Sequence, residues 1–144
     1  MCIRDRFWDE GAKGTMEGDL LFENGCSTDG RSGTALYVDG GAAPSIVTIT
    51  HVTITGHNCP FTPPAGAPIF VEAGSKLTVK NSIIWNNSGE FETLDGGTFQ
   101  VENSISKASG KGNRSVDPQF VDPANGDFHV KSGSPAKDAG AYAN

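Results

Sequence analysis

The sequence predicts an all-β, single-stranded parallel β-helix, which is a solenoid of about four coils followed by a C-terminal capping segment. Two observations lead to this fold class. Four stretches of the chain repeat one pattern, in which two short apolar runs flank a bend, and three of these stretches follow an additional strand-like run. Repetition at intervals of roughly 20 to 50 residues is typical of solenoids, whose units stack on their neighbours to bury an apolar face.

The repeat is visible as columns of matching residues when the four stretches are placed in register. The first column consists of Met16, Ile49, Val79 and Val101. The second consists of Leu20, Thr53, Ile83 and Ile105, and the third of Leu21, Ile54, Ile84 and Ser106. The run before each bend alternates apolar and polar residues, which is typical of a half-buried strand. From its column, Ile83 is expected to be a core side chain.

A fourth column marks the bend between the two runs. It consists of Gly18, His51, Asn81 and Asn103, which are 33, 30 and 22 residues apart (51 − 18, 81 − 51 and 103 − 81). Asparagine tolerates the left-handed backbone conformation that a sharp bend requires. Because stacked strands lie about 4.8 Å apart, we predict that His51, Asn81 and Asn103 form a turn ladder of amide hydrogen bonds along the stack. The alternative, that they are ordinary exposed turn residues, stays open.

An additional strand precedes three of the paired runs, at residues 35–40, 68–73 and 91–96. Each of these runs ends in an acidic residue followed by small residues that favour a turn. Three strands per turn of the chain predict a parallel β-helix. Long helices are not expected, because 19 glycines and 8 prolines interrupt the chain and apolar residues do not recur at helical spacing.

Three segments are expected along the chain. Residues 1–6 match nothing in the repeat and resemble a translated sequencing-adapter remnant, so we set them aside as an expected artefact of assembly. Residues 7–110 contain the coils, and residues 111–144 form the capping segment. We expect this segment to be truncated and the chain to be a fragment of a longer protein.

The sequence argues against a nucleic-acid partner and against a membrane-spanning helix. The chain has 17 acidic and 11 basic residues and a net charge of −6. Nucleic-acid binders usually carry a basic stripe, whereas Lys107, Lys111 and Arg114 lie in a Gly/Ser-rich stretch that reads as a solvated loop, so no nucleic-acid partner is expected. No apolar run approaches the roughly 18 residues that a membrane-spanning helix needs, and no transmembrane segment is expected.

Cys26 and Cys59 are 33 residues apart (59 − 26), which equals the interval between the first two bends. They should therefore stack in adjacent coils. Equivalent Cα atoms about 4.8 Å apart lie inside the range that a disulfide bridges. A disulfide and a pair of reduced thiols at neighbouring turns both fit this spacing, and an oxidising compartment would favour the disulfide.

Several motifs resemble a known group of proteins. The stretches GTALYVDGG and VTITHVTITGHN are similar to repeats of the right-handed parallel β-helix proteins of the pectin-lyase-like superfamily, including polymorphic outer-membrane proteins. NSIIWNN followed by VDPQFVDPANGDFHVKSGSPAKDAG resembles the terminal segment of choice-of-anchor Q domains in bacterial secreted or surface proteins. The resemblance implies a right-handed helix, an extracellular or cell-surface (outer membrane-associated) location, and a structural or adhesive role, with extracellular or cell-surface polysaccharide as the expected partner.

The resemblance also implies an alternative function, as a fragment of a polysaccharide lyase or glycoside hydrolase whose catalytic coils lie largely upstream. Enzymes of this superfamily use carboxylates along a groove, as acid and base or to hold calcium. Asp39, Glu72 and Asp95, which close the leading strands, are the candidate catalytic residues. No arginine follows them in register, so solvated turn acids are the favoured interpretation.

Two further ligand sites were considered. Asp117, Asp122 and Asp127 could bind calcium, but nothing around them resembles a complete loop of six to eight oxygen ligands, and no cofactor is expected. Trp85, Tyr37 and Phe70 could stack on sugar rings, although aromatic residues at such positions more often belong to the core.

Overall fold

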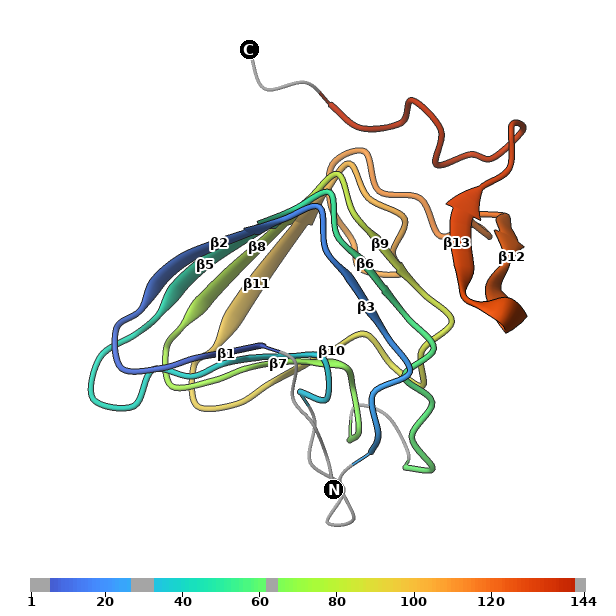
Figure 1. The fold of residues 1–144 in the computed structure, drawn as a ribbon. Coiled ribbons are helices and arrows are strands. Elements are labelled where there is room, and N and C mark those ends of the chain that lie inside the picture. The colour runs from blue at the N-terminus through green and yellow to red at the C-terminus, as the bar shows by residue number, and fades with distance from the viewer. Residues whose placement is uncertain (1–5, 27–32, 62–64, 142–144) are drawn as a thin grey trace.

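The computed structural model describes residues 6–26, 33–61 and 65–141, and the prediction of an all-β parallel β-helix is confirmed. Within these residues the chain winds through three parallel sheets that form the sides of a triangular prism (Figure 1). Sheet 1 contains β1 (Arg6–Trp8), β4 (Leu36–Val38), β7 (Ile69–Val71) and β10 (Phe91–Thr93). Sheet 2 contains β2 (Lys13–Glu17), β5 (Ile46–Thr50), β8 (Lys76–Lys80) and β11 (Thr98–Glu102), and sheet 3 contains β3 (Leu20–Phe22), β6 (Thr53–Thr55) and β9 (Ile83–Trp85).

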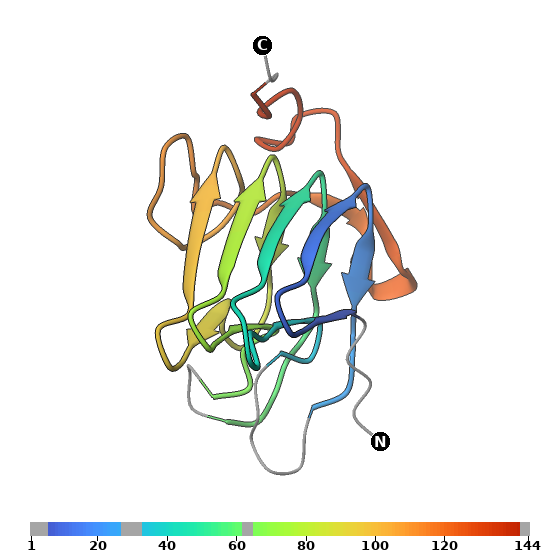
Figure 2. The same ribbon diagram turned by 90° about the vertical axis from the view of Figure 1, so that its left-hand side faces the viewer.

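Strand pairing places the aligned residues side by side. In sheet 2 the pairs join the whole first column in order, Met16 to Ile49 to Val79 to Val101. In sheet 3 they join the second column, Leu20 to Thr53 to Ile83, and an isolated bridge adds Ile105. Figure 2 shows the four strands of sheet 2 next to one another, one strand from each coil. Both columns are confirmed.

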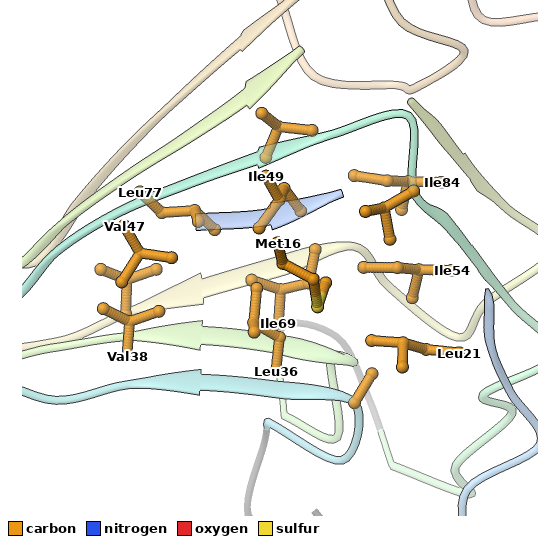
Figure 3. Packing of buried hydrophobic residues seen from close by; sticks show 14 of the residues in the cluster. Met16, Leu21, Leu36, Val38, Val47, Ile49, Ile54, Ile69, Leu77 and Ile84 are labelled. Carbon is orange, nitrogen blue, oxygen red and sulfur yellow. The ribbon is translucent and has the colours of Figure 1, made fainter. Parts of the chain in front are cut away.

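The core is a column of aliphatic side chains that the three sheets turn inwards (Figure 3). Sheet 3 contributes Leu21, Ile54 and Ile84. Ile83 is only partly buried, so the expectation that it is a core side chain is wrong. Successive side chains in a strand point to opposite faces, and Ile84 occupies the inner position. Burying one such side chain contributes roughly 1.5–3 kcal/mol.

The bend column adopts the left-handed conformation. The φ angles of Gly18, His51, Asn81 and Asn103 are 73°, 57°, 50° and 50°. The amide ladder needs correction, because the side chains of His51 and Asn81 have other partners. Asn81 donates from Nδ2 to the carbonyl of Ala141 and accepts from its N–H, both at 2.9 Å. Nδ1 of the exposed His51 lies 3.3 Å from Oε1 of Glu17.

The side-chain hydrogen bonds that run along the stack are made by the buried serines that directly follow the bend residues. Ser82 Oγ accepts the N–H of Val52 at 3.1 Å, and Ser104 Oγ accepts the N–H of Ser82 at 3.1 Å. Asn113 Oδ1 then accepts the N–H of Ser104 at 3.1 Å. Each of these N–H groups follows a left-handed bend residue and is buried, so it needs an acceptor inside the protein. The next coil supplies that acceptor.

A second set of bonds follows the same rule at the start of sheet 2. The N–H of Ala12 donates to Ser45 Oγ at 3.1 Å, and the N–H of Ser45 donates to Ser75 Oγ at 2.9 Å. Asn87 spans a third bend, where it accepts from the N–H of His57 at 3.0 Å. In every case the backbone of one coil donates to a side chain of the following coil.

Residues 111–114 stack on the last coil as the start of a further one, although we assigned them to the capping segment. Ile105 forms a parallel bridge with Arg114, and the N–H of Arg114 donates to the carbonyl of Ser104 at 2.9 Å. Asn113 Nδ2 donates to the carbonyl of Val101, also at 2.9 Å. The coil series therefore extends to Arg114.

The start of the coil series also differs from the expected boundary. Arg6, which was grouped with the leader, belongs to β1 and pairs with Leu36. Its N–H donates to the carbonyl of Ala35 at 3.1 Å. Residues 1–5 of the leader lie outside the described residues.

The C-terminal segment forms an antiparallel hairpin of β12 (Phe120–Asp122) and β13 (Asp127–Val130), joined by the short 3₁₀ turn Pro123–Asn125. We expected it to fold over the end of the last coil. Instead it lies along the outer side of sheet 3 (Figure 1). The reason is the apolar outer face of that sheet, where Phe22 of the first coil packs against Phe128 with ring centroids 5.1 Å apart.

Candidate functional site

A groove of about 470 Å³ lies between sheet 3 and the hairpin, and we call it the flank groove. Its apolar walls are Trp85 of β9 on one side and Phe120 and Phe128 of the hairpin on the other. Polar side chains line it as well: Glu23, Thr55, Asn86, Asp117, Gln119 and Lys131. A concave site with aromatic walls and a few polar groups is the usual form of a ligand-binding site.

The hairpin wall is held in place by aromatic contacts. Phe128 packs against Phe22 of β3, and it meets Phe120 edge to face with centroids 5.3 Å apart. Phe120 is buried. Aromatic pairs in such tilted or edge-to-face arrangements contribute about 0.5–1.5 kcal/mol beyond the area they bury. The groove is therefore built from residues that are distant in sequence.

The sheet wall is a row of outward-facing residues, one from each of three coils. Phe22 pairs with Thr55 and Thr55 with Trp85. Thr55 and Trp85 both line the groove; Thr55 is buried, whereas Trp85 is partly exposed.

Tyr37 and Phe70, the other two aromatic candidates, lie on the outer face of sheet 1. Their rings stack with centroids 5.2 Å apart and planes 5° apart, and Phe7 adds a third ring 5.0 Å from Tyr37. Tyr37 is only 9% exposed. Because one face of each stacked ring is covered by its neighbour, these residues serve the packing of adjacent coils, and Trp85 is the member of the trio that faces a groove.

Three non-glycine residues of the flank groove have left-handed backbone conformations. The φ angles of Glu23, Asn86 and Gln119 are 51°, 54° and 56°. Glu23 and Asn86 occupy equivalent bends, and the coil between them has Gly56 at φ 76°. Glycine and asparagine suit this conformation, whereas glutamate and glutamine do not. Unfavourable backbone conformations of this kind cluster at functional sites.

The charges of the groove are two carboxylates and one ammonium. Asp117 Oδ1 accepts the N–H of Gln119 at 2.7 Å. Among the described residues, the carboxylate of Glu23 forms no hydrogen bond, and neither it nor Asp117 forms an ion pair with Lys131. The groove therefore presents acceptors that are free to bind a ligand.

The comparisons with known proteins agree with this architecture. The family model described as "Right handed beta helix region" matches residues 8–117. The chain belongs to the right-handed β-helix family. No curated protein and no solved structure matches it. The family match covers the coils and ends before β12, so it does not include the hairpin wall of the groove.

In this β-helix the candidate catalytic acids lie at the ends of the strands of sheet 1. Asp39 and Glu72 follow paired strands in register, and Asp95 comes one step later. Glu72 Oε1 accepts a hydrogen bond from the hydroxyl of Tyr37, and Asp39 Oδ1 accepts the N–H of Gly41 at 3.1 Å. Asp95 has φ 48° in an exposed turn. These acids do not line the flank groove, and they support no catalytic proposal.

Cys26 and Cys59 are joined by a disulfide with Cα atoms 5.4 Å apart. It links the loop that leaves sheet 3 in the first coil to the equivalent loop in the second coil. Cys59 is buried, and its N–H donates to Ser88 Oγ of the third coil at 3.0 Å.

The aspartates considered for calcium each bond within their own turn. Asp117 accepts from Gln119, and Asp122 Oδ2 accepts from the amide of Asn125 at 2.7 Å. Asp127 Oδ1 lies 2.6 Å from Nδ1 of His129, and the hydrogen bonds from that histidine lower the pKa of the carboxyl. In the described part of the chain, no group of three or more His, Cys, Asp or Glu side chains is placed to hold a metal.

Sequence reasoning missed the flank groove and the serines inside the stack. The serines had a signal, because Ser82 and Ser104 each follow the bend column directly. The groove had a weaker signal in the sequence, because Glu23 occupies a bend position where the next coil has Gly56.

No helix among the described residues is long and apolar enough to cross a membrane.

Proposed function

We propose that this β-helix is a structural and adhesive module of an extracellular or cell-surface protein, and that it binds carbohydrate in the flank groove. The observation that carries the proposal is Trp85, a partly exposed aromatic side chain in a groove that is also lined by two amide and two carboxylate side chains, those of Asn86, Gln119, Glu23 and Asp117. Sugars have apolar ring faces and polar edges, and tryptophan with neighbouring hydrogen-bonding side chains is complementary to both.

Two further observations support the proposed location. A disulfide between adjacent coils is stable in oxidising compartments. The terminal segment resembles choice-of-anchor Q domains, which occur in secreted or surface proteins of bacteria. The rod-like stacking of coils suits a spacer that holds a binding groove away from a surface.

The test is a binding measurement on a panel of polysaccharides and oligosaccharides that are neutral, acidic or amine-bearing. We expect the wild-type chain to bind at least one of them, and Trp85→Ala to weaken that binding about tenfold, because aromatic contacts contribute about 1.5 kcal/mol at most beyond buried area. Phe7→Ala is the matched control, since Phe7 is 51% exposed and lies on sheet 1, away from the groove.

Wild-type protein that binds no member of the panel would refute the proposal. Equal binding by wild type and Trp85→Ala would place carbohydrate elsewhere on the molecule. The same samples should be monitored for new reducing ends, because cleavage that Trp85→Ala abolishes would favour the lyase or hydrolase alternative for this groove.

A further inference from the structure

We infer that the flank groove selects glycans that carry free amino groups, and that Glu23 is the residue that recognises them. The inference rests on the proposed carbohydrate binding and assigns its chemical class. It starts from the row of bends that lines the groove, which consists of Glu23, Gly56 and Asn86 in three successive coils. Glu23 is the member of this row that brings a charge to the groove.

The side chain of Glu23 lies over a glycine of the next coil, as the side chain of Glu10 does over Gly41. A Cβ atom at Gly56 would lie only 3.1 Å from Cγ of Glu23. The side chain of Glu23 therefore extends along the stack over Gly56, in the direction of the groove that both residues line. Glycine in the second coil leaves the room that the glutamate of the first coil occupies.

The carboxylate of Glu23 has no competing partner among the described residues, since the ion pairs there are those of His51 with Glu17 and of His129 with Asp127. Asp117 adds a second carboxylate, and Lys131 is the one basic side chain that lines the groove. The groove thus has an excess of one negative charge, and the whole chain carries −6. This charge attracts ammonium groups and repels uronates.

The groove also has the length of a short piece of glycan. Glu23, Gly56 and Asn86 come from three successive coils, so the groove spans two steps of about 4.8 Å along the stack. Trp85 lies next to Asn86, at the opposite end from Glu23. A disaccharide unit can therefore stack one ring on Trp85 while an amine of the other ring meets Glu23.

The test compares chitosan oligosaccharides, which have free amines, with their N-acetylated equivalents and with oligogalacturonate. We expect wild-type protein to bind the free-amine form at least about fivefold more tightly than the acetylated form, the scale of one partly exposed ion pair, and to bind oligogalacturonate least. Raising the salt concentration to about 1 M, where the Debye length falls to about 3 Å, should remove most of the difference.

The decisive variant is Glu23→Asn, because its effect on folding stability and its effect on ligand preference are expected to differ. Asparagine fits the left-handed bend better than glutamate, so the melting temperature should rise or stay the same, while the preference for free amines is lost. Glu10→Asn is the matched control, since Glu10 has the same φ of 51° and lies outside the flank groove. It should change stability in the same direction and leave the preference intact.

The outcomes for this inference and for carbohydrate binding are distinguishable. Equal or tighter binding of the acetylated oligosaccharides, still sensitive to Trp85→Ala, would overturn the inference and leave carbohydrate binding standing. A free-amine preference that survives Glu23→Asn would overturn the role of Glu23. Absence of binding to all the glycans would overturn both.

Discussion

Replacing Ser82 by alanine tests whether the serines inside the stack stabilise the coils. Ser82 is 4% exposed, and its Oγ makes two hydrogen bonds, from the N–H of Val52 at 3.1 Å and to the carbonyl of Lys80 at 2.7 Å. The carbonyl of Lys80 keeps a second partner, the N–H of His51 at 3.2 Å. The loss therefore falls mainly on Val52, whose N–H would be buried without an acceptor.

An unsatisfied buried donor costs about 1–3 kcal/mol, so Ser82→Ala should lower the free energy of unfolding by that amount. Urea unfolding followed by tryptophan fluorescence measures it, and the slope against urea should stay unchanged if the variant keeps its compactness. Ser115→Ala is the control, because Ser115 is exposed and changes at such sites usually fall within about 0.5 kcal/mol. If the two variants were equally stable, the serine bonds would contribute nothing and the reasoning would be wrong.

Two other predictions concern packing and covalent linkage. Ile84→Ala should lower the free energy of unfolding by about 2–5 kcal/mol. Ile83→Ala should lower it by clearly less, since Ile84 is fully buried and Ile83 is not. Equal losses in urea unfolding would contradict the assignment of inner and outer faces. Protein purified without reductant should expose at most one reactive thiol when unfolded, that of Cys2, and three after reduction. The double variant Cys26→Ser/Cys59→Ser should have a free energy of unfolding about 4 kcal/mol lower than the wild type, by the loop-closure estimate for a separation of 33 residues. Two further reactive thiols in the unreduced protein would contradict the disulfide.

The coil register could be predicted from sequence because it depends on a repeat that is local to each coil. Met16, Ile49, Val79 and Val101 share a column as predicted, since a strand slipped by one residue would turn its apolar side chains to solvent. Deciding which residues face inwards after the bend was harder. The left-handed residue interrupts the alternation, so Ile83 was taken for a core side chain although Ile84 is the one that the core contains.

The flank groove could not be predicted, because it depends on contacts that no repeat encodes. Phe22 and Phe128 are 106 residues apart (128 − 22) and meet only when the hairpin folds back along sheet 3. The sequence showed the apolar residues of the hairpin but not which surface they cover. A solenoid exposes both the end of its last coil and the outer sides of its sheets, and only the three-dimensional packing shows which of them the hairpin covers.

The side-chain hydrogen bonds that follow the bends give the solenoid a direction. The amides of Val52, Ser82 and Ser104 all donate forwards, to a side chain that comes later in the chain. A coil is thus complete only when its successor is present, and Asn113 completes the final one. In a stack that ended one coil earlier, the amide after its last bend would be a buried donor without an acceptor. Removing coils from the front leaves these later amides satisfied, whereas cutting before Asn113 orphans the amide of Ser104 and makes the last coil the weakest.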